Sequence, residues 1–599
     1  MRKLALSVAL VLLFLGSASA QSPKHEMRGA WIATVINLDW PRSANSSTAV
    51  KQVELRQMLD DLASAGINSV FFQVRTECDA LYDSPFEPWS VYLTGQQGRA
   101  PAPFFDPLEF VVEEAHARGM SLHAWLNPFR CEREVGRYAL ASGHPVLEHP
   151  EWMLTLESQS TSGLFHTIMN PGLDAVHEYV AGIVDDIVRR YDVDGIHFDD
   201  YFYPYPPYEM GASDLETFND NPRGFLNLDT WRRDNINRFV ARIYDTVSTV
   251  KPDAVFGISP FGIWKSGVPQ GINGLSAVDA LFADAVAWLD EGSVDYIAPQ
   301  LYWPFGGGQD FGALAGWWSS VSNGRHVYPG LAAYRADGAT GGTFAREVVP
   351  AQIRFSRSAP GVEGNIHFRA QNIRPSAASS LPDSLISDLY ARQAIPPLMA
   401  HRDAFPPEAP DAPRASVVTL TGGESSVILE WDPSIFGFVL ARSFAVYRAE
   451  GETPPDPRSM TTGSEFLLGR AFEPRFVDSP PGTGPYHYVV TALSGNFAES
   501  TESTLVTVDG LFVGTEPSDL PQEPSLDVFP NPFSQGVTLS GATGVLDVYD
   551  VLGRRVWHEA IPESGTSWTP GPHVVSGLYM FRLTTETGRV LLNTALLVR

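Results

Sequence analysis

Two adjacent acidic residues, Asp199 and Asp200, carry the clearest chemical signal in this sequence. They follow a short apolar run, and an aromatic, proline-rich segment begins directly after them at Tyr201. Hydrolysis of a glycosidic bond needs a carboxyl group that protonates or assists the leaving oxygen, and aromatic faces hold sugar rings. The pair therefore predicts cleavage of a sugar polymer, although an isolated Asp-Asp suits a loop cap or a structural cation equally well.

The two-residue periodicity of a strand sorts the side chains around this pair. Ile196 and Phe198 fall on one face and should pack against surrounding helices, whereas His197 and Asp199 fall on the other face. On strict alternation Asp200 faces away from Asp199 unless the strand has already ended.

A second acid is required beside Asp199, and the sequence offers Asp200 and Glu77. Two carboxylates held close together repel each other, so the pKa of one rises and supplies a protonated acid near neutral pH. The alternative for Glu77 is an ion pair with Arg75 or Arg130.

Residues about 25–400 alternate short apolar runs with longer amphipathic segments, which predicts a (β/α)₈ TIM barrel. The expected strands are Gly29–Ile36, Asn68–Val74, Ser121–Asn127, Val193–Asp199, Ala254–Ser259, Tyr296–Tyr302, Val327–Ala332 and Asn365–Phe368. Expected helices include Val50–Ala65, Pro107–Arg118, Asp174–Tyr191 and Thr230–Val250. A doubly wound open sheet is the alternative fold, but no glycine-rich phosphate loop supports it.

A barrel places its chemistry at the carboxyl ends of its strands, and these ends are rich in polar and aromatic residues. We expect them to bind substrate, although each alone is as often a packing residue. The residues are Trp31, Arg75, Trp125, Asn127, His197, Tyr201, Gln300, Tyr302 and Trp303. No cluster of Cys and His residues predicts a metal site or a cofactor.

The barrel region resembles the secreted family-10-like glycosyl hydrolases over about 350 residues. The resemblance rests on Met27–Val35, Phe72–Arg75, His123–Pro128, Asp194–Tyr201 and Val294–Trp303. It implies a glycoside hydrolase acting on an amino-sugar polymer such as peptidoglycan glycan strands. The fourth strand is also similar to that of retaining α-glucan hydrolases, but those carry a Glu on the fifth strand, which here ends at Ser259. A catalytically inactive carbohydrate-binding surface protein is therefore the alternative, and an adhesin is a third hypothesis.

The rest of the chain predicts export and two small all-β domains. Residues 1–20 have the basic start, apolar run and Ala-x-Ala end of a signal peptide. Residues 411–510 resemble a fibronectin type III domain, which suggests a spacer or a sugar-binding module. Residues 525–599 resemble a type IX secretion sorting domain, with Pro-Asn-Pro at 530–532 and Gly-Leu-Tyr at 577–579. This implies passage through the periplasm and outer membrane by the type IX machinery, ending in a secreted or surface-attached protein.

Charge and apolar patterning limit the partners of the protein. The sequence has 69 acidic and 42 basic residues, and the net charge of −27 disfavours nucleic acid. After the signal peptide no apolar run is long enough to span a membrane, and we expect a monomer that meets a polysaccharide substrate.

The only two cysteines, Cys78 and Cys131, follow the second and third expected strands. Adjacent parallel strands lie about 4.8 Å apart, so the loops after them can meet. The sequence predicts a disulfide between the two, and two separate free thiols are the alternative.

Overall fold

The computed structural model describes residues 22–339, 341–402, 405–419, 425–433, 439–509, 526–529, 535–541, 543–550, 554–562, 565–571, 574, 577–585 and 590–597. The chain divides into two compact units, Met1–Val513 and Gly514–Arg599. The expected signal peptide at 1–20 and the Pro-Asn-Pro motif at 530–532 lie outside the described residues.

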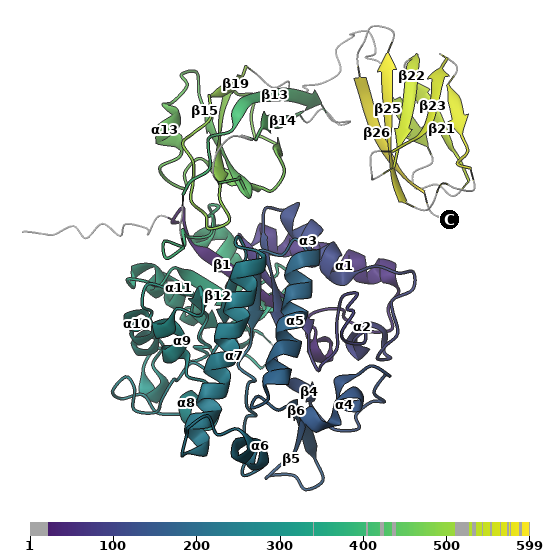
Figure 1. The fold of residues 1–599 in the computed structure, drawn as a ribbon. Helices are drawn as coiled ribbons and strands as arrows, with labels where there is room; N and C mark the ends of the chain where they lie inside the picture. The colour runs from purple at the N-terminus through teal and green to yellow at the C-terminus, as the bar shows by residue number, and fades with distance from the viewer. Residues whose placement is uncertain are drawn as a thin grey trace, which may run out of the picture. The chain divides into compact units, whose positions relative to one another are not determined.

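The first unit is built on a parallel sheet that curls back on itself (Figure 1). Its strand order is β10-β9-β8-β7-β3-β2-β1-β12-β11. The strands are β1 (Met27–Ile32), β2 (Ser69–Arg75), β3 (Ser121–Leu126), β7 (Gly195–Phe198), β8 (Val255–Ile258), β9 (Tyr296–Ile297), β10 (His326–Val327), β11 (Gly330–Leu331) and β12 (Gly364–His367). Only two residues separate β10 from β11, the strands at the two ends of this order, so the sheet closes as expected of a TIM barrel.

Two expected strands differ from the observed ones. The run Val327–Ala332 is split at Tyr328 and Pro329 into β10 and β11, because proline lacks the N–H that a continuous ladder needs. The run Tyr296–Tyr302 keeps only its first two residues in the ladder as β9, and the rest forms a loop at the barrel mouth.

Helices surround the sheet, as the amphipathic segments predicted. The main ones are α1 (Thr48–Ser64), α3 (Pro107–His116), α5 (Asp174–Arg190), α7 (Leu228–Val250), α9 (Ala285–Glu291), α10 (Phe311–Ser320) and α11 (Val348–Ser358). Local sequence sets their ends. Asp106 caps α3 by accepting hydrogen bonds from the next backbone N–H groups, and Gly66 follows α1 at a φ of +76°.

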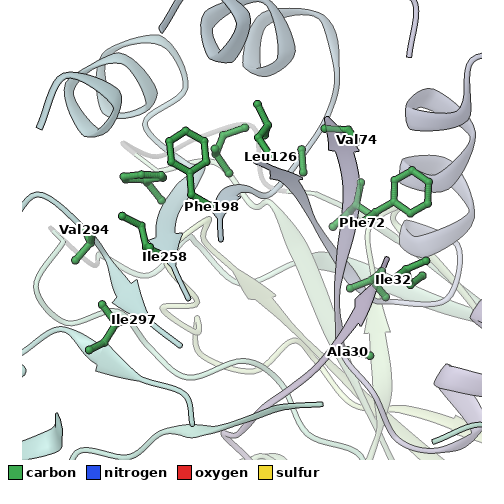
Figure 2. Close-up of a cluster of buried hydrophobic side chains, with 14 of the residues drawn as sticks. Ala30, Ile32, Phe72, Val74, Leu126, Phe198, Ile258, Val294 and Ile297 are labelled. Carbon is green, nitrogen blue, oxygen red and sulfur yellow. The ribbon is translucent and has the colours of Figure 1, made fainter. Parts of the chain in front are cut away.

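The core lies between the sheet and the helices (Figure 2). Outward-facing strand residues such as Ile32, Phe72, Leu126, Phe198 and Ile258 are fully buried there. This packing fixes which strand residues point outward, and therefore which ones point into the barrel.

A small antiparallel sheet is inserted after β3 and stands beside the barrel mouth. Its order is β4 (Arg130–Glu132), β6 (Phe165–Met169), β5 (Met153–Glu157). The short helix α4 (Pro145–Glu148) lies in the same connection, between β4 and β5. Other connections carry the short helices α2 (Val91–Thr94), α6 (Leu215–Asp220) and α8 (Ala277–Ala280), and α12 (Leu381–Ser384) follows the last barrel strand.

Two antiparallel sheets follow the barrel within the first unit. One contains β13 (Asp411–Thr419), β14 (Ser425–Asp432) and β17 (Arg475–Asp478); the other contains β16 (Leu467–Ala471), β15 (Ser443–Glu450), β18 (Tyr486–Leu493) and β19 (Val506–Val508). The short helix α13 (Pro457–Met460) follows β15. Trp431 is buried against Phe444, 5.2 Å between ring centroids, in the core between these sheets.

This β-rich region contacts the amino-terminal end of the barrel strands. Arg442 lies 2.8 Å from Asp194, the residue before β7, and Arg470 donates to the Ser121 hydroxyl at the start of β3 (2.7 Å). The Phe472 ring stacks on His116 at 3.8 Å. The contacts are therefore at the end of the barrel opposite the strand ends that carry the candidate site.

The second unit is also all-β. One sheet has the strand order β20 (Leu526–Phe529), β21 (Val537–Gly541), β24 (Thr566–Trp568). The other has the order β23 (Arg555–Ile561), β22 (Gly544–Tyr549), β25 (Gly577–Thr585), β26 (Val590–Leu597). Across the described ranges of both units, no helix has the length and apolar character needed to cross a bilayer.

Candidate active site

Strand β7 delivers both aspartates to the mouth of the barrel. His197 is level with Trp125 on β3 and with Gly257 on β8. Phe198, the last strand residue, points outward and stacks on Phe239 of α7 with 5.8 Å between ring centroids. The strand therefore ends before Asp199, and both carboxyl groups lie beyond the ladder at its carboxyl end.

His197 and Trp31 form the floor beneath the aspartates rather than a substrate surface. The Trp31 indole N–H donates to His197 Nε2 at 3.0 Å, and the Tyr296 hydroxyl lies 3.1 Å from Nδ1. Burial lowers the pKa of His197 well below its usual value, so the ring is neutral. His197 is fully buried and Trp31 is 2% exposed, so neither side chain has an open face here, and substrate binding by either stays a prediction. Gly257 makes room here, since a Cβ on it would meet the Tyr296 ring at 2.1 Å.

Asp199 is held by two side-chain donors from β3 and the segment after it. Its Oδ2 accepts from Trp125 Nε1 (3.2 Å) and Asn127 Nδ2 (3.3 Å), and the backbone N–H of Tyr201 points to Oδ1 at 3.5 Å. The residue is 4% exposed. Burial raises its pKa to about 7, and repulsion from Asp200 adds to this while Arg130 opposes it.

Asp200 faces the same mouth because the strand has ended. Its Oδ2 accepts a short hydrogen bond from the Tyr205 hydroxyl, and it is 2% exposed. Burial raises the pKa of Asp200 to about 6, while hydrogen bonds from Tyr205 and Gln300 lower it. The two neighbouring carboxyl groups therefore both titrate close to neutral pH, with Asp199 the more readily protonated.

Such a pair suits acid–base chemistry at neutral pH. One group keeps a proton that it can donate, and its neighbour is ionised at the same pH. In the parts of the chain that the structure describes, no cluster of three or more His, Cys, Asp or Glu side chains is placed to hold a metal ion.

The aromatic groups at the mouth divide into accessible and inaccessible ones. Tyr201 is 40% exposed, and Tyr302 and Trp303 are partly exposed, so each has a face that can meet a sugar ring. Gln300 is partly exposed between them and donates to the Ser259 carbonyl at 2.9 Å. Trp125 is almost buried, and its indole N–H is committed to the carboxylate of Asp199.

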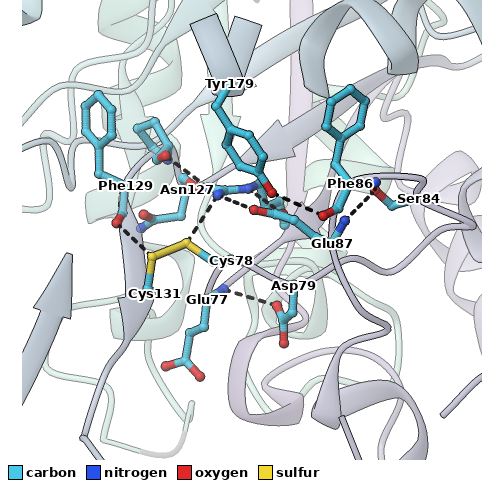
Figure 3. Close-up of polar contacts among 12 residues, drawn as sticks. Glu77, Cys78, Asp79, Ser84, Phe86, Glu87, Asn127, Phe129, Cys131 and Tyr179 are labelled. Atoms are coloured by element: carbon cyan, nitrogen blue, oxygen red, sulfur yellow. Dashed lines mark hydrogen bonds and ion pairs between the residues drawn. A yellow bond between two sulfur atoms is a disulfide. The ribbon is translucent and has the colours of Figure 1, made fainter. Parts of the chain in front are cut away.

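Arg75 and Asn127, both expected to bind substrate, are structural instead. Arg75 is fully buried and forms a two-pronged ion pair with Glu87, 2.6 and 2.8 Å (Figure 3). It also donates to the carbonyl groups of Asn127 and Pro128. The Asn127 side chain is buried between the carboxylate of Asp199 and the backbone N–H of Arg130 (2.9 Å). Both residues therefore position the loops that hold Asp199.

Glu77 is not placed as a catalytic acid. Its carboxylate is 1% exposed and accepts from the hydroxyl groups of Tyr92 (3.0 Å) and Tyr138 (2.7 Å) and from the backbone N–H of Arg133 (3.0 Å). The expected ion pair with Arg75 or Arg130 is replaced by one with the Arg133 guanidinium, 3.6 Å away. These three donors and the Arg133 guanidinium occupy the Glu77 carboxylate, so the contacts observed for it are with protein groups away from Asp199 and Asp200.

The predicted disulfide is present. Cys78 and Cys131 are bonded, with their Cα atoms 4.6 Å apart and a sequence separation of 53 (Figure 3). The bond ties the loop after β2 to strand β4, next to Arg130.

One contributor to the site was missed by the sequence analysis, Tyr205. It donates to Asp200 and belongs to the aromatic segment that follows the acid pair, which was the available signal. Arg130, which the sequence offered as an ion-pair partner of Glu77, lies over the Tyr201 ring, 4.8 Å from its centroid.

The fold and the acid pair together define a (β/α)₈ barrel of the kind that carries glycosidase sites at its carboxyl-terminal face. Comparison with known proteins gives the family: residues 26–341 match the glycosyl hydrolase-like 10 family, and the chain belongs to it.

The chain is similar to two curated relatives. It is 36% identical over 446 residues to glycosyl hydrolase YngK of Bacillus subtilis, an alignment covering 73% of this chain and 85% of YngK. It is 37% identical over 343 residues to glycosyl hydrolase DigH of Escherichia coli K12, covering 53% and 75% of the two chains. Among solved structures, the catalytic domain of a β-amylase from Paenibacillus polymyxa superposes with a TM-score of 0.43 at 10% identity, covering 62% of this chain and 99% of that chain.

Proposed function

We propose that this protein is a glycoside hydrolase in which Asp199 and Asp200 cleave the glycosidic bond. The observation that carries the proposal is the pair of adjacent, nearly buried carboxyl groups at the carboxyl end of β7, with pKa values raised to about 7 and about 6. Perturbed carboxyl groups in a cleft are the usual mark of acid–base catalysis.

In the proposed reaction the two groups have different roles. Asp199 has the higher pKa and gives its proton to the glycosidic oxygen while the bond from that oxygen to the anomeric carbon breaks. Ionised Asp200 stabilises the positive charge that develops on the sugar ring. Water then adds to the anomeric carbon and returns a proton to Asp199, so the site is restored. Trp125 and Asn127 keep the Asp199 carboxyl group in place throughout.

The proposed substrate is a polysaccharide, with amino-sugar polymers such as peptidoglycan glycan strands as its class. Membership of the glycosyl hydrolase-like 10 family and relatives named glycosyl hydrolase support the reaction type. The exposed faces of Tyr201, Tyr302 and Trp303 suit stacking on pyranose rings.

One observation favours an inactive carbohydrate-binding protein instead. Strand β8 ends at Ile258, and the next residue is Ser259, whose hydroxyl lies 3.2 Å from the buried His197. This strand end therefore has a serine where a carboxylic acid was expected. The acid must then come from the pair on β7 itself, and turnover is what separates the two candidates.

A glycan screen tests the proposal. Peptidoglycan, glycan strands freed of peptide, and plant and algal polysaccharides are incubated with the purified protein, and new reducing ends are counted. An Asp290→Asn variant serves as a control for the same substitution at an exposed position on α9. We expect reducing ends from at least one amino-sugar polymer with both proteins. Binding of a polymer without any cleavage would establish the inactive alternative.

We further propose that the protein is exported by its amino-terminal signal peptide and crosses the outer membrane through the type IX machinery. Support comes from the sequence of residues 1–20 and of 525–599. Deleting residues 525–599 in the native host should leave the protein in the periplasm, and surface exposure of the truncated form would contradict this route.

A further inference from the structure

A cleft opens beside the acid pair, and two of the residues that line it contact the pair. It has a volume of about 320 Å³ and is lined by Arg130, Arg133, Glu134, Leu164, His166 and four residues of 201–208. Tyr201 and Tyr205 line the cleft and also contact the acid pair. The backbone N–H of Tyr201 points to Asp199, and the Tyr205 hydroxyl donates to Asp200. A group bound in this cleft is therefore next to the reacting bond.

Two guanidinium groups give the cleft its charge. Arg130 is held by the Thr76 carbonyl, at 3.2 and 3.3 Å from two of its nitrogens, and lies over the Tyr201 ring. The Arg133 side chain is 33% exposed, and its Nε is buried without a hydrogen-bond partner, with Glu77 at 3.6 Å. Both arginines line the cleft, but Arg130 is only 6% exposed, so Arg133 is the guanidinium that a substrate group meets more openly.

Aromatic rings form the walls. His166 and Tyr208 stack with 5.0 Å between ring centroids, and Tyr201 and Tyr205 lie 5.4 Å apart. Burial, together with the nearby charges of Arg130 and Arg133, lowers the pKa of His166 to about 4, so this ring is neutral at pH 7. The positive charge that lines the cleft therefore comes from the two arginines, with the carboxylate of Glu134 in the lining and that of Glu77 3.6 Å from Arg133.

The backbone that carries the two arginines is anchored, and the Arg130 guanidinium is held by the Thr76 carbonyl. Both lie on or directly after β4, which pairs with β6 of the inserted sheet, and the Cys78–Cys131 disulfide fastens β4 to the loop after β2. A prearranged guanidinium loses little freedom on binding, and its fork matches the two oxygens of a carboxylate.

We propose that this cleft is a subsite for a sugar ring that bears a carboxylate, with the ring against the tyrosines and the carboxylate on Arg133 and Arg130. The proposal rests on the proposed glycosidase activity and narrows its substrate to an acidic glycan. The carboxylate can belong to the ring, as in a uronic acid, or to an ether-linked lactyl group, as in muramic acid.

The test compares each acidic polymer with its own methyl ester, which removes the charge and keeps the sugar. Muramic-acid glycan strands freed of peptide form one arm, and a polyuronate forms the other. We expect the wild type to prefer the free acid in one arm, and Arg133→Gln to reduce the acid-to-ester ratio of kcat/KM by about ten- to a hundredfold, as for loss of a charged hydrogen bond. The arm that shows the effect identifies the source of the carboxylate.

Matched variants exclude a general effect of charge or folding. Arg189→Gln removes the same charge from an exposed position on α5 that does not line the cleft, and it should keep the wild-type ratio. Arg133→Lys keeps the charge without the fork and should give an intermediate ratio. An unchanged ratio in Arg133→Gln, with glycan cleavage intact, overturns the subsite alone.

Absence of cleavage by the wild type would refute the glycosidase and still leave the subsite testable. Calorimetric titration with a muramic-acid disaccharide, a uronate disaccharide and their methyl esters then decides. Weaker binding of an acid, but not of its ester, to Arg133→Gln supports the subsite, and equal binding of acid and ester to the wild type overturns it.

Discussion

Replacing Asp199 by Asn should remove a large pH dependence of stability. The carboxyl group has a pKa of about 7 in the folded protein, chiefly because it is buried, against about 3.9 in an unfolded chain. Between these values the folded state binds a proton that the unfolded state does not, so stability falls as pH rises from about 4 to about 7 and stays lower above it. The difference of about three pKa units between the folded and unfolded states corresponds to about 4 kcal/mol of unfolding free energy.

The assay is thermal unfolding of wild type and Asp199→Asn at pH 4 and pH 8. About 370 barrel residues give an unfolding entropy near 0.8 kcal/mol/K, so 4 kcal/mol corresponds to about 5 °C. We expect the melting temperature of the variant, relative to wild type, to be about 5 °C higher at pH 8 than at pH 4. Comparing the two pH values cancels the effect of the changed hydrogen bonds to Trp125 and Asn127.

A matched substitution separates this effect from the protein's general acid response. Asp290 is exposed, so Asp290→Asn should follow the wild-type melting temperature at both pH values. If the melting temperature of Asp199→Asn also follows that of the wild type at both pH values, Asp199 ionises without cost in the folded protein. Asp199 then carries no proton near neutral pH.

Three further predictions concern the support of the site. Replacing Cys78 and Cys131 by Ser should cost about 4 kcal/mol in the chain-entropy model for a loop of this length, seen as a lower melting temperature that reductant no longer affects. Tyr205→Phe removes a hydrogen bond that lowers the pKa of Asp200, so the acid limb of the pH–rate profile should move to higher pH; an unmoved limb would contradict the contact. Arg75→Ala leaves its buried carboxylate partner without a counter-charge and should cost about 3–5 kcal/mol in unfolding free energy, whereas a cost below about 1 kcal/mol would show that the pair is dispensable.

The sequence predicted the barrel and the place of the acid pair because both follow from local periodicity. Alternation along β7 put Ile196 and Phe198 against the helices, as observed. It could not place Asp200, whose orientation depends on where the ladder ends, and the structure ends β7 at Phe198.

Partners from distant segments explain the errors at the site. Glu77 meets Tyr92 and Tyr138, which come from two separate connections with no periodic signal. Arg75 was expected at the mouth from its position at a strand end, but Glu87 in the following loop turns it into a buried support. A strand-end position therefore predicts that a residue is near the site, and tertiary partners decide whether it faces the substrate.

The rate of glycan cleavage by Asp199→Asn tests the central claim most directly. The substitution keeps the size of the side chain and removes the proton that the proposed reaction transfers. On the best substrate from the screen, the account predicts a loss in kcat of at least about a hundredfold, with a folded protein that still binds the polymer. Turnover within a few-fold of the wild type would contradict the assignment of Asp199 as the catalytic acid.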